Sequence, residues 1–399
     1  MNKEIITKYL PLITMTTIAS QMLTVAVGYQ IYELTRSAFL LGIAGLIQFL
    51  PRIILIFHAG TLSDKYDRRI IVKITQASIL IISLVLGFLS FFHVVSPLTL
   101  LIVVFLYGAI FTIEGPAVTA LLPNLVSREE FAHTNARVNS INEAAYLVGP
   151  ALAGLLYLLG PDIVYWAIII ANVIAIVSAN LITDKHIISA SKRMDSSTSS
   201  IKATLDGFKY IWQQKGILGA ISLDLFVVLF GGVTALLPIY ATTILEVGPA
   251  GFGFLRSANS IGAVLMAIYL AYHLPQKNVG KLMFGAVAVF GLSIIVFAFS
   301  RNFFLSMFIL IILGAADQIS VLIRSTFIQV KTPDEVRGRV TNVNLIFISA
   351  SSQLGEFESG MVASLMGAIN ATIFGGVMVF VVILIWYKYF AELRELQSL

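Results

Sequence analysis

A series of about twelve apolar stretches, each roughly 20 residues long, runs through this chain and constrains its fold more than any other feature. Such a stretch spans the hydrocarbon core of a bilayer as a single α-helix. The stretches fall at roughly 9–33, 38–60, 70–92, 97–122, 135–158, 162–183, 216–244, 250–273, 280–299, 302–326, 338–367 and 371–390. Charged residues make up 12% of the 399-residue chain, far less than in soluble proteins. We therefore predict an all-α polytopic membrane protein, which excludes a soluble globular protein, a disordered chain and a DNA-binding domain.

The basic residues predict the orientation of these spans. With the N-terminus inside, only Arg36 and Arg301 of the 26 lysines and arginines fall in outer loops. Arg52 and Arg256 lie within spans, and the remaining ones, Arg324 among them, are assigned to the inner side. Because basic loops stay in the cytoplasm, an even number of spans places both termini there. The net charge of +5 then reflects loops that face anionic lipid, and no nucleic-acid partner is expected.

A polar stretch divides the chain near its midpoint. Residues 189–200 are Ser-rich, as in a flexible linker, and residues 201–212 carry apolar side chains at helical spacing. This second part is typical of an amphipathic helix on a membrane surface. We predict an N-terminal six-helix half over 1–184, a cytoplasmic linker over 185–215 and a C-terminal six-helix half over 216–399.

The two halves contain similar sequences. Arg-Val-Asn-Ser-Ile-Asn opens the fifth span at Arg137, and Arg-Val-Thr-Asn-Val-Asn opens the eleventh span at Arg339, about half the chain further on. Duplicated membrane halves of this kind are typical of transporters that hold their substrate between the halves near the bilayer midplane.

The loop between the second and third spans carries a recognisable motif. Residues 60–69 read Gly-Thr-Leu-Ser-Asp-Lys-Tyr-Asp-Arg-Arg, which resembles the G-x-L-x-D-R/K-x-G-R/K-R/K signature of the major facilitator superfamily. A glycine here lets two helices approach closely, an acid can face the positive N-terminus of a neighbouring helix, and basic residues hold the turn at the anionic inner surface. Asp67 replaces the second glycine of the signature. The matching residues are Gly60, Asp64, Lys65, Arg68 and Arg69.

Other segments are similar to the third drug:proton antiporter family, which includes macrolide exporters and the enterobactin exporter. They are residues 32–37, 50–52, 248–253 and 355–360. The resemblance covers nearly the whole chain and implies the major facilitator fold: twelve transmembrane helices in two pseudo-symmetric six-helix halves. It also implies a location in the cell inner membrane and action as a monomer.

In the fifth span, Gly149-Pro150-Ala-Leu-Ala-Gly154 is similar to the antiporter signature G-P-x-x-G-G. Proline kinks the helix, and small residues permit tight packing against another helix. In the family this element is linked to export. The fourth-span signature R-x-x-Q-G is not kept, because Val104 and Tyr107 occupy its Arg and Gln positions. The resemblance therefore assigns no coupling role to the fourth span.

Eight charged residues fall inside the predicted spans, where a charge costs about 2.5–3.5 kcal/mol on insertion scales. An acid without a cationic partner there can bind and release a proton, as proton-coupled exchange requires. We rank Asp224 first, because no basic residue lies near it along its span, and then Asp317, which Arg324 follows two turns later. The other cavity candidates are Glu114, Glu143, Glu356 and Glu358, with Glu114 also placed to support a kink at Pro116.

The two basic residues inside spans are predicted to form an interface ion pair or a gate. In this fold the second and eleventh spans are neighbours, so Arg52 is placed to pair with Glu356 or Glu358. Arg256 is the other candidate. Such a pair would be structural and would not bind substrate.

We predict a secondary active exporter of an amphipathic small molecule, a drug-like compound or a siderophore, that works by alternating access with proton antiport. A lysophospholipid or lipid transporter and an uncoupled facilitator of the same fold are the alternatives. No P-loop and no H-E-x-x-H occurs, so the chain is not expected to be an enzyme. Without cysteine there is no Cys-ligated metal. We expect no metal and no cofactor, the proton gradient as energy source, and the lipid bilayer and a small-molecule substrate as partners.

Overall fold

The computed structural model describes residues 3–126, 128–182 and 200–398, and the described part is nearly all helical, without β-strands. Contacts divide the chain into two compact units. Unit 1 comprises Met1–Arg36 and Ile47–Ser200, and unit 2 comprises Ser37–Leu46 and Ile201–Leu399. The Ser-rich residues of the predicted linker lie outside the described residues. The predicted domain boundaries at 184 and 216 stay a prediction.

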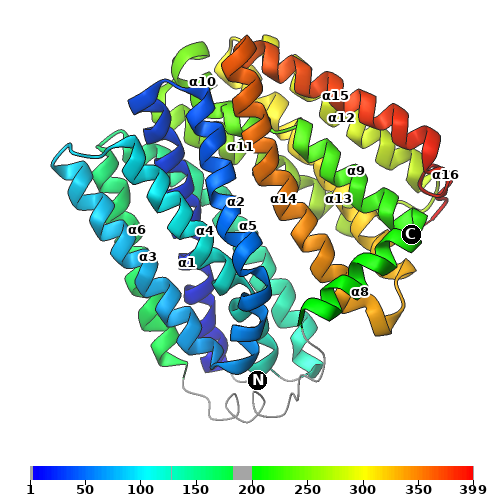
Figure 1. Ribbon diagram of the computed structural model, residues 1–399, viewed down its shortest axis with the longest axis horizontal. Coiled ribbons are helices and arrows are strands. Elements are labelled where there is room, and N and C mark those ends of the chain that lie inside the picture. The colour runs from blue at the N-terminus through cyan, green and yellow to red at the C-terminus, as the bar shows by residue number, and fades with distance from the viewer. Residues whose placement is uncertain (1–2, 127, 183–199, 399) are drawn as a thin grey trace. The chain divides into compact units, whose positions relative to one another are not determined.

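Unit 1 is built from long helices (Figure 1). They are α1 (Lys3–Thr35), α2 (Ala38–Lys65, whose first residues belong to unit 2), α3 (Arg68–Phe91), α4 (Pro97–Leu121), the 3₁₀ turn η1 (Leu122–Asn124), α5 (Arg128–Tyr157) and α6 (Pro161–Leu181). Ser96 caps α4 by accepting a hydrogen bond from the backbone N–H of Thr99, at 3.2 Å. Pro97 follows at a position where its missing N–H costs nothing.

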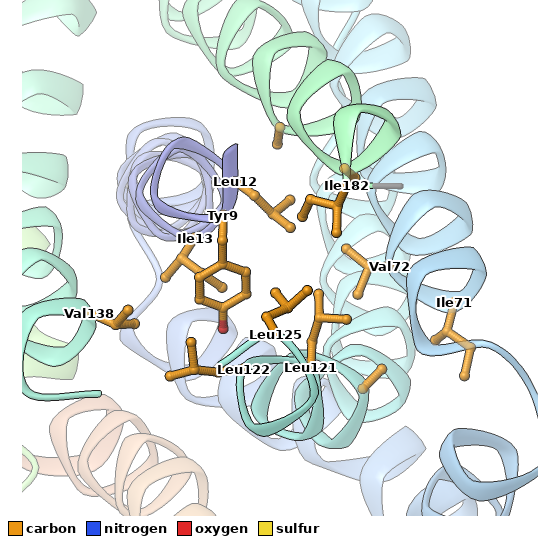
Figure 2. Close-up of a cluster of buried hydrophobic side chains, with 13 residues drawn as sticks. Tyr9, Leu12, Ile13, Ile71, Val72, Leu121, Leu122, Leu125, Val138 and Ile182 are labelled. Carbon is orange, nitrogen blue, oxygen red and sulfur yellow. The ribbon is translucent and has the colours of Figure 1, made fainter. Parts of the chain in front are cut away.

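A cluster of buried apolar side chains closes one end of unit 1. Figure 2 shows Tyr9, Leu12 and Ile13 of α1 gathered with the side chains of α3, η1 and α6. Helices that are far apart in sequence contribute to this cluster. Its other labelled members are Ile71, Val72, Leu121, Leu122, Leu125, Val138 and Ile182. It fixes the ends of α3, α4 and α6, where the loop motif lies.

Unit 2 contains the remaining helices. They are α8 (Ser200–Gln213), α9 (Lys215–Phe230), η2 (Val233–Leu236), α10 (Leu237–Ile239), η3 (Tyr240–Ile244), α11 (Gly248–Tyr272), α12 (Val279–Phe299), α13 (Phe303–Lys331), α14 (Asp334–Met366), α15 (Ala368–Tyr389) and α16 (Ala391–Arg394). The sequence predicts one continuous span over 216–244. The structure interrupts it after Phe230, where Gly231 and Gly232 pack against Phe290 of α12 and the backbone of Gly355 in α14.

Ten helices of the described part are long and apolar enough to cross a membrane. Helices α5 and α14 are also long, with 30 and 33 residues, but they contain the polar sequences around Arg137 and Arg339. Together with these two, the structure contains the twelve long segments that the sequence predicts.

Small residues join the first part of α2 to α14 within unit 2. A Cβ atom on Gly42 would lie 2.9 Å from the carbonyl oxygen of Phe357, and one on Gly45 would lie 2.9 Å from Oε2 of Glu356. A Cβ on Gly360 would lie 2.5 Å from the Cα of Gly42. This backbone-to-backbone approach explains why Ser37–Leu46 is grouped with unit 2.

The predicted amphipathic helix is present as α8. Ile211 is buried, and Phe208 packs against Phe347 of α14 with ring centroids 5.6 Å apart and the rings tilted by 56°. Asp206 forms an ion pair with Arg339 at 3.6 Å. Helix α8 is therefore attached to α14, and its contact with a membrane surface stays a prediction.

Candidate functional site

Three charged residues form a cluster inside unit 2. Arg324 of α13 is 6% exposed, and its guanidinium forms an ion pair with the carboxylate of Asp224 on α9. The side chain of Asp224 is 14% exposed. Sequence spacing suggested Asp224 because its own span holds no nearby basic residue. The structure supplies that residue from another helix. The assignment of Arg324 to the inner side stays a prediction.

Asp317 is the third member of this cluster. It lies two turns before Arg324 on α13, and its charge interacts with those of Arg324 and Asp224. Its carboxylate has no hydrogen bond and no ion pair within the described residues. The cluster thus contains two carboxylates and one guanidinium, which gives it a net charge of −1, and the binding of one proton makes it neutral.

The helix that carries Asp317 is held close to α11. A Cβ on Gly314 would overlap the carbonyl oxygen of Asn259, and one on Gly262 would overlap that of Ile311. The side-chain oxygens of Asn259 and Ser320 are buried without a hydrogen-bond partner. Glycine is needed at these positions because the two backbones touch there.

Arg256 of α11 has a counter-charge on α14. Its positive charge interacts with that of Glu356, and both side chains are half-buried in unit 2. Glu358, two residues later, is near the hydroxyl of Ser359 at 3.4 Å. The predicted pairing of Arg52 with either carboxylate would join residues of the two units and stays a prediction.

Unit 1 contains a buried carboxylate with neutral partners. Glu114 of α4 is 5% exposed and accepts hydrogen bonds from Nε2 of Gln76 at 2.5 Å and from Oγ1 of Thr75 at 3.1 Å. Both partners lie on α3. Glu114 therefore contacts α3 side chains, not the backbone at Pro116 that the sequence suggested. Within the described part of unit 1, no cation forms an ion pair with it.

Arg52 lies among aromatic side chains of α4. Its guanidinium carbon is 5.3 Å from the ring centroid of Phe111, and its charge interacts with Tyr107. The hydroxyl of Tyr107 forms a hydrogen bond with that of Ser20 on α1. The rings of Tyr107 and Phe111 are 6.2 Å apart. Tyr107 occupies the position where the fourth-span antiporter signature has glutamine.

Helix α5 packs against α1 at the predicted antiporter-type element. Gly149 and Pro150 are buried, and a Cβ on Gly149 would lie 2.6 Å from the Cβ of Gln21. One turn before Gln21 on α1, Oγ1 of Thr17 donates a hydrogen bond to Oδ1 of Asn142 of α5 at 2.5 Å. Gly154 is buried on the same helix. The cavity candidate Glu143 also lies on α5, but its side chain is exposed, whereas that of the candidate Glu114 is buried.

The loop motif ties helix ends together in unit 1. Arg68 donates to the backbone carbonyl of Ala120 at 3.1 Å, and Arg69 donates to that of Ile182 at 3.0 Å. These carbonyls lie at the C-terminal ends of α4 and α6, which attract positive charge. The motif residues Gly60, Asp64 and Lys65 belong to the last turns of α2, and their side chains lie outside the described residues.

Asp67, which replaces the glycine of the signature, has its own role. It caps α3 by accepting a hydrogen bond from the backbone N–H of Arg69 at 2.9 Å, and it forms an ion pair with the Arg69 guanidinium at 2.8 Å. Burial opposes ionisation of Asp67, but the hydrogen bonds and charge of Arg69 outweigh burial and hold the pKa of this carboxyl below its ordinary value.

We expect Asp67→Asn to destabilise the protein by about 1 kcal/mol or less at pH 7, because an amide still caps the helix but loses the ion pair. The pKa of Asp67 is lower in the folded protein than in the unfolded chain, where it is about 3.9. Its contribution is therefore complete above about pH 4 and is lost as the pH falls through the folded pKa.

Melting temperatures of the purified protein in detergent between pH 7 and pH 3 measure this effect. The difference between wild type and Asp67→Asn should shrink towards pH 3. Glu335→Gln, which changes an exposed acid in the first turn of α14, is the matched control. A difference that stays constant over this range would contradict the assignment.

Sequence reasoning missed Thr75 and Gln76, the hydrogen-bond donors to Glu114. The sequence contained a sign of this role, because Thr75 and Gln76 are two adjacent polar residues in the first third of an apolar span. A buried amide in lipid needs a polar partner, and this requirement points from α3 to an acid on another helix.

Comparison with known proteins connects this arrangement to transport. A family model described as a transmembrane secretion effector matches residues 10–399. Macrolide efflux protein A of Streptococcus pyogenes is 24% identical over 374 residues, covering 91% of this chain and 90% of the relative. The enterobactin exporter EntS of Escherichia coli is 24% identical over 332 residues, covering 81% of this chain and 76% of the exporter.

A solved structure of similar fold is that of the nucleoside transporter NupG. It superposes with a TM-score of 0.75 over 98% of this chain and 99% of its own, at 12% identity. This likeness confirms the predicted fold class, the twelve-helix major facilitator fold. The family and these relatives are membrane transporters, which confirms that the chain is a membrane transport protein and not an enzyme.

Proposed function

Because the chain belongs to the transmembrane secretion effector family of the major facilitator superfamily, we propose that it exports an amphipathic small molecule in exchange for protons. The efflux and export activities named for its relatives support the outward direction. The substrate class of drug-like compounds or siderophores follows from the same relatives. Alternating access, with one half moving against the other around a central site, is the mechanism of such folds.

The cluster of Asp224, Arg324 and Asp317 is the observation that carries proton coupling. Arg324 is engaged by Asp224, whereas Asp317 has no hydrogen bond or ion pair among the described residues. A net charge inside a membrane protein is unfavourable unless a counter-charge or water lies near it. Proton binding at Asp317 removes the net charge of the cluster.

This charge balance gives a cycle. The protonated, neutral cluster permits the transition between outward-open and inward-open states. On the inner side Asp317 releases its proton, and the charged cluster holds the protein open until substrate binds. After substrate leaves on the outer side, a proton from outside binds Asp317 and resets the cycle. The protein then resides in the cell inner membrane with both termini in the cytoplasm and acts as a monomer.

Transport by the purified full-length protein in liposomes tests the proposal. Ethidium, erythromycin and a siderophore serve as probes, under pH gradients of either sign. With acid inside, protons leave and substrate should accumulate. Asp317→Asn fixes the cluster in its neutral form, so it should lose gradient-driven accumulation at least tenfold while still exchanging substrate across the membrane without a gradient.

Asp206→Asn is the matched control, because it removes an exposed acid of unit 2 and should accumulate probes like wild type. If wild type accumulates no probe under either gradient, the exporter proposal fails. If Asp317→Asn accumulates like wild type, Asp317 is not the coupling residue. Movement of a lysophospholipid without proton dependence would instead support the lipid-transporter alternative.

A further inference from the structure

We propose that Arg52 is an anion-recognition site that accepts a carboxylate attached to an aromatic or other flat apolar group. This inference rests on the proposed export function and specifies its substrate class, because it predicts that organic anions bind better than neutral compounds of the same shape.

The depth of Arg52 in the membrane is the first argument. It lies near the middle of α2, which runs from Ala38 to Lys65. At 1.5 Å per residue it is about 20 Å from either end of the helix. The last residues of α2 belong to the loop motif that begins at Gly60, so Arg52 lies about 12 Å from the inner end of the predicted span, and an unpaired charge at this depth is costly.

The second argument is that Arg52 has no anionic partner in unit 1. It donates no hydrogen bond and forms no ion pair in the described part of this unit, although a guanidinium carries five N–H donors. The nearest acid on the facing helix is Glu114, one turn from Phe111, and its carboxylate is engaged by Gln76 and Thr75.

Unit 2 also has two arginines inside its spans, and both of these have an acidic partner. Arg324 is paired with Asp224, and the charge of Arg256 interacts with that of Glu356. Among the described residues of unit 1, by contrast, Arg52 has only aromatic and hydroxyl neighbours. We infer that its counter-charge comes with the ligand.

The aromatic side chains around Arg52 indicate the rest of the ligand. Phe111 lies beneath the guanidinium, and Tyr107 lies beside Phe111. Tyr146 of α5 interacts electrostatically with Tyr107. Phe111 and Tyr146 are each 38% exposed, so part of each ring is free to contact a ligand. A guanidinium binds a carboxylate through two parallel hydrogen bonds, while the rings stack on a flat apolar group.

A pair of probes that differ only in charge tests this site. Naphthalene-2-carboxylate and naphthalene-2-carboxamide have the same ring and nearly the same size. Equilibrium binding to the purified full-length protein in detergent should favour the carboxylate about tenfold or more, because a charge-assisted bidentate contact replaces a neutral one. Arg52→Gln should bind both probes equally.

Two further variants complete the test. Arg52→Lys keeps the charge but not the bidentate geometry, and it should retain only part of the preference. It also serves as the measured variant if Arg52→Gln does not fold. Arg301→Gln is the matched control, because Arg301 is exposed and donates to the backbone carbonyls of Ala298 and Ser300. It should keep the full preference.

Equal binding of the two probes to wild type overturns the anion site, and so does an unchanged preference in Arg52→Gln. Neither result affects the exporter proposal, because accumulation under a pH gradient is measured separately with other probes. If the protein transports cations and neutral drugs but does not prefer the carboxylate, the exporter proposal stands and the anion site is contradicted.

Discussion

Gly262→Ala is expected to lower the free energy of unfolding by about 1–3 kcal/mol and to reduce the amount of folded protein recovered from membranes. Gly262 lies where α11 meets α13, and a methyl group there would overlap the carbonyl oxygen of Ile311. Backbone atoms cannot rotate away as a flexible side chain does. The helices must therefore separate, which loses packing along the rest of their contact.

The same contact has a second glycine on the facing helix. A Cβ on Gly314 would overlap the carbonyl oxygen of Asn259. Gly314→Ala should therefore be about as costly as Gly262→Ala. Because both substitutions push the same pair of helices apart, the double variant should cost less than the sum of the two.

Gly285→Ala provides the control for this experiment. Gly285 also lies within a membrane helix, α12, but a Cβ there would have no neighbour within 4 Å. Fluorescence-detected size-exclusion chromatography after heating measures all four variants. Alanine is the better helix former, so Gly285→Ala should not lower the melting temperature. If Gly262→Ala melted at the same temperature as Gly285→Ala, the close contact with the Ile311 carbonyl would not limit the side chain at position 262.

The fold was predictable because membrane physics leaves few choices. Each apolar stretch must be a helix, since lipid offers no hydrogen-bond partner to an open backbone. The break within 216–244 was harder to foresee. Residues 231–232 form a Gly-Gly pair, but the break also depends on Phe290 of α12 and Gly355 of α14, which only the folded structure brings there.

The candidate site was predictable as a set of residues but not as a set of pairs. Composition along a span identifies Asp224, Glu114 and Asp317 as costly charges. It cannot show that Arg324 of α13 meets Asp224 of α9, because helices far apart in sequence make that contact. The sequence used Arg324 to orient the spans by the positive-inside rule, and this use does not reveal its acidic partner.

The role of Asp67 in the loop motif was also not predictable from the sequence. Asp67 departs from the family signature, and sequence alone offered no reason for the change. The structure gives one, since the carboxylate caps α3 and holds Arg69 towards the C-terminal end of α6. A departure from a signature can therefore carry its own local stabilisation.

The buried ion pair of unit 2 predicts the largest loss of stability. Arg324→Gln is expected to destabilise the protein by about 3–5 kcal/mol, because it leaves the carboxylate of Asp224 buried without its cation. Asp317 adds a second negative charge to the same region, since it also interacts with Arg324. The measurement is the melting temperature of purified protein, together with its yield from membranes.

A second substitution should reverse most of this loss. Arg324→Gln combined with Asp224→Asn removes both charges of the pair and leaves two neutral amides that can hydrogen-bond. We expect the double variant to be more stable than Arg324→Gln alone, which is the signature of a coupled pair in a double-mutant cycle. If the two substitutions simply added, the residues would not depend on each other.

Arg339→Gln is the control that separates burial from charge. Arg339 also pairs with an aspartate of unit 2, Asp206, but at 3.6 Å and with side chains 41% and 45% exposed. Water screens such a pair, so its loss should cost about 1 kcal/mol or less. Both variants remove a guanidinium from the aspartate with which it forms an ion pair, and a large difference between them would therefore measure what burial and the neighbouring charge of Asp317 add. Equal losses would mean that Arg324 and Asp224 are far more hydrated than their position in the fold implies.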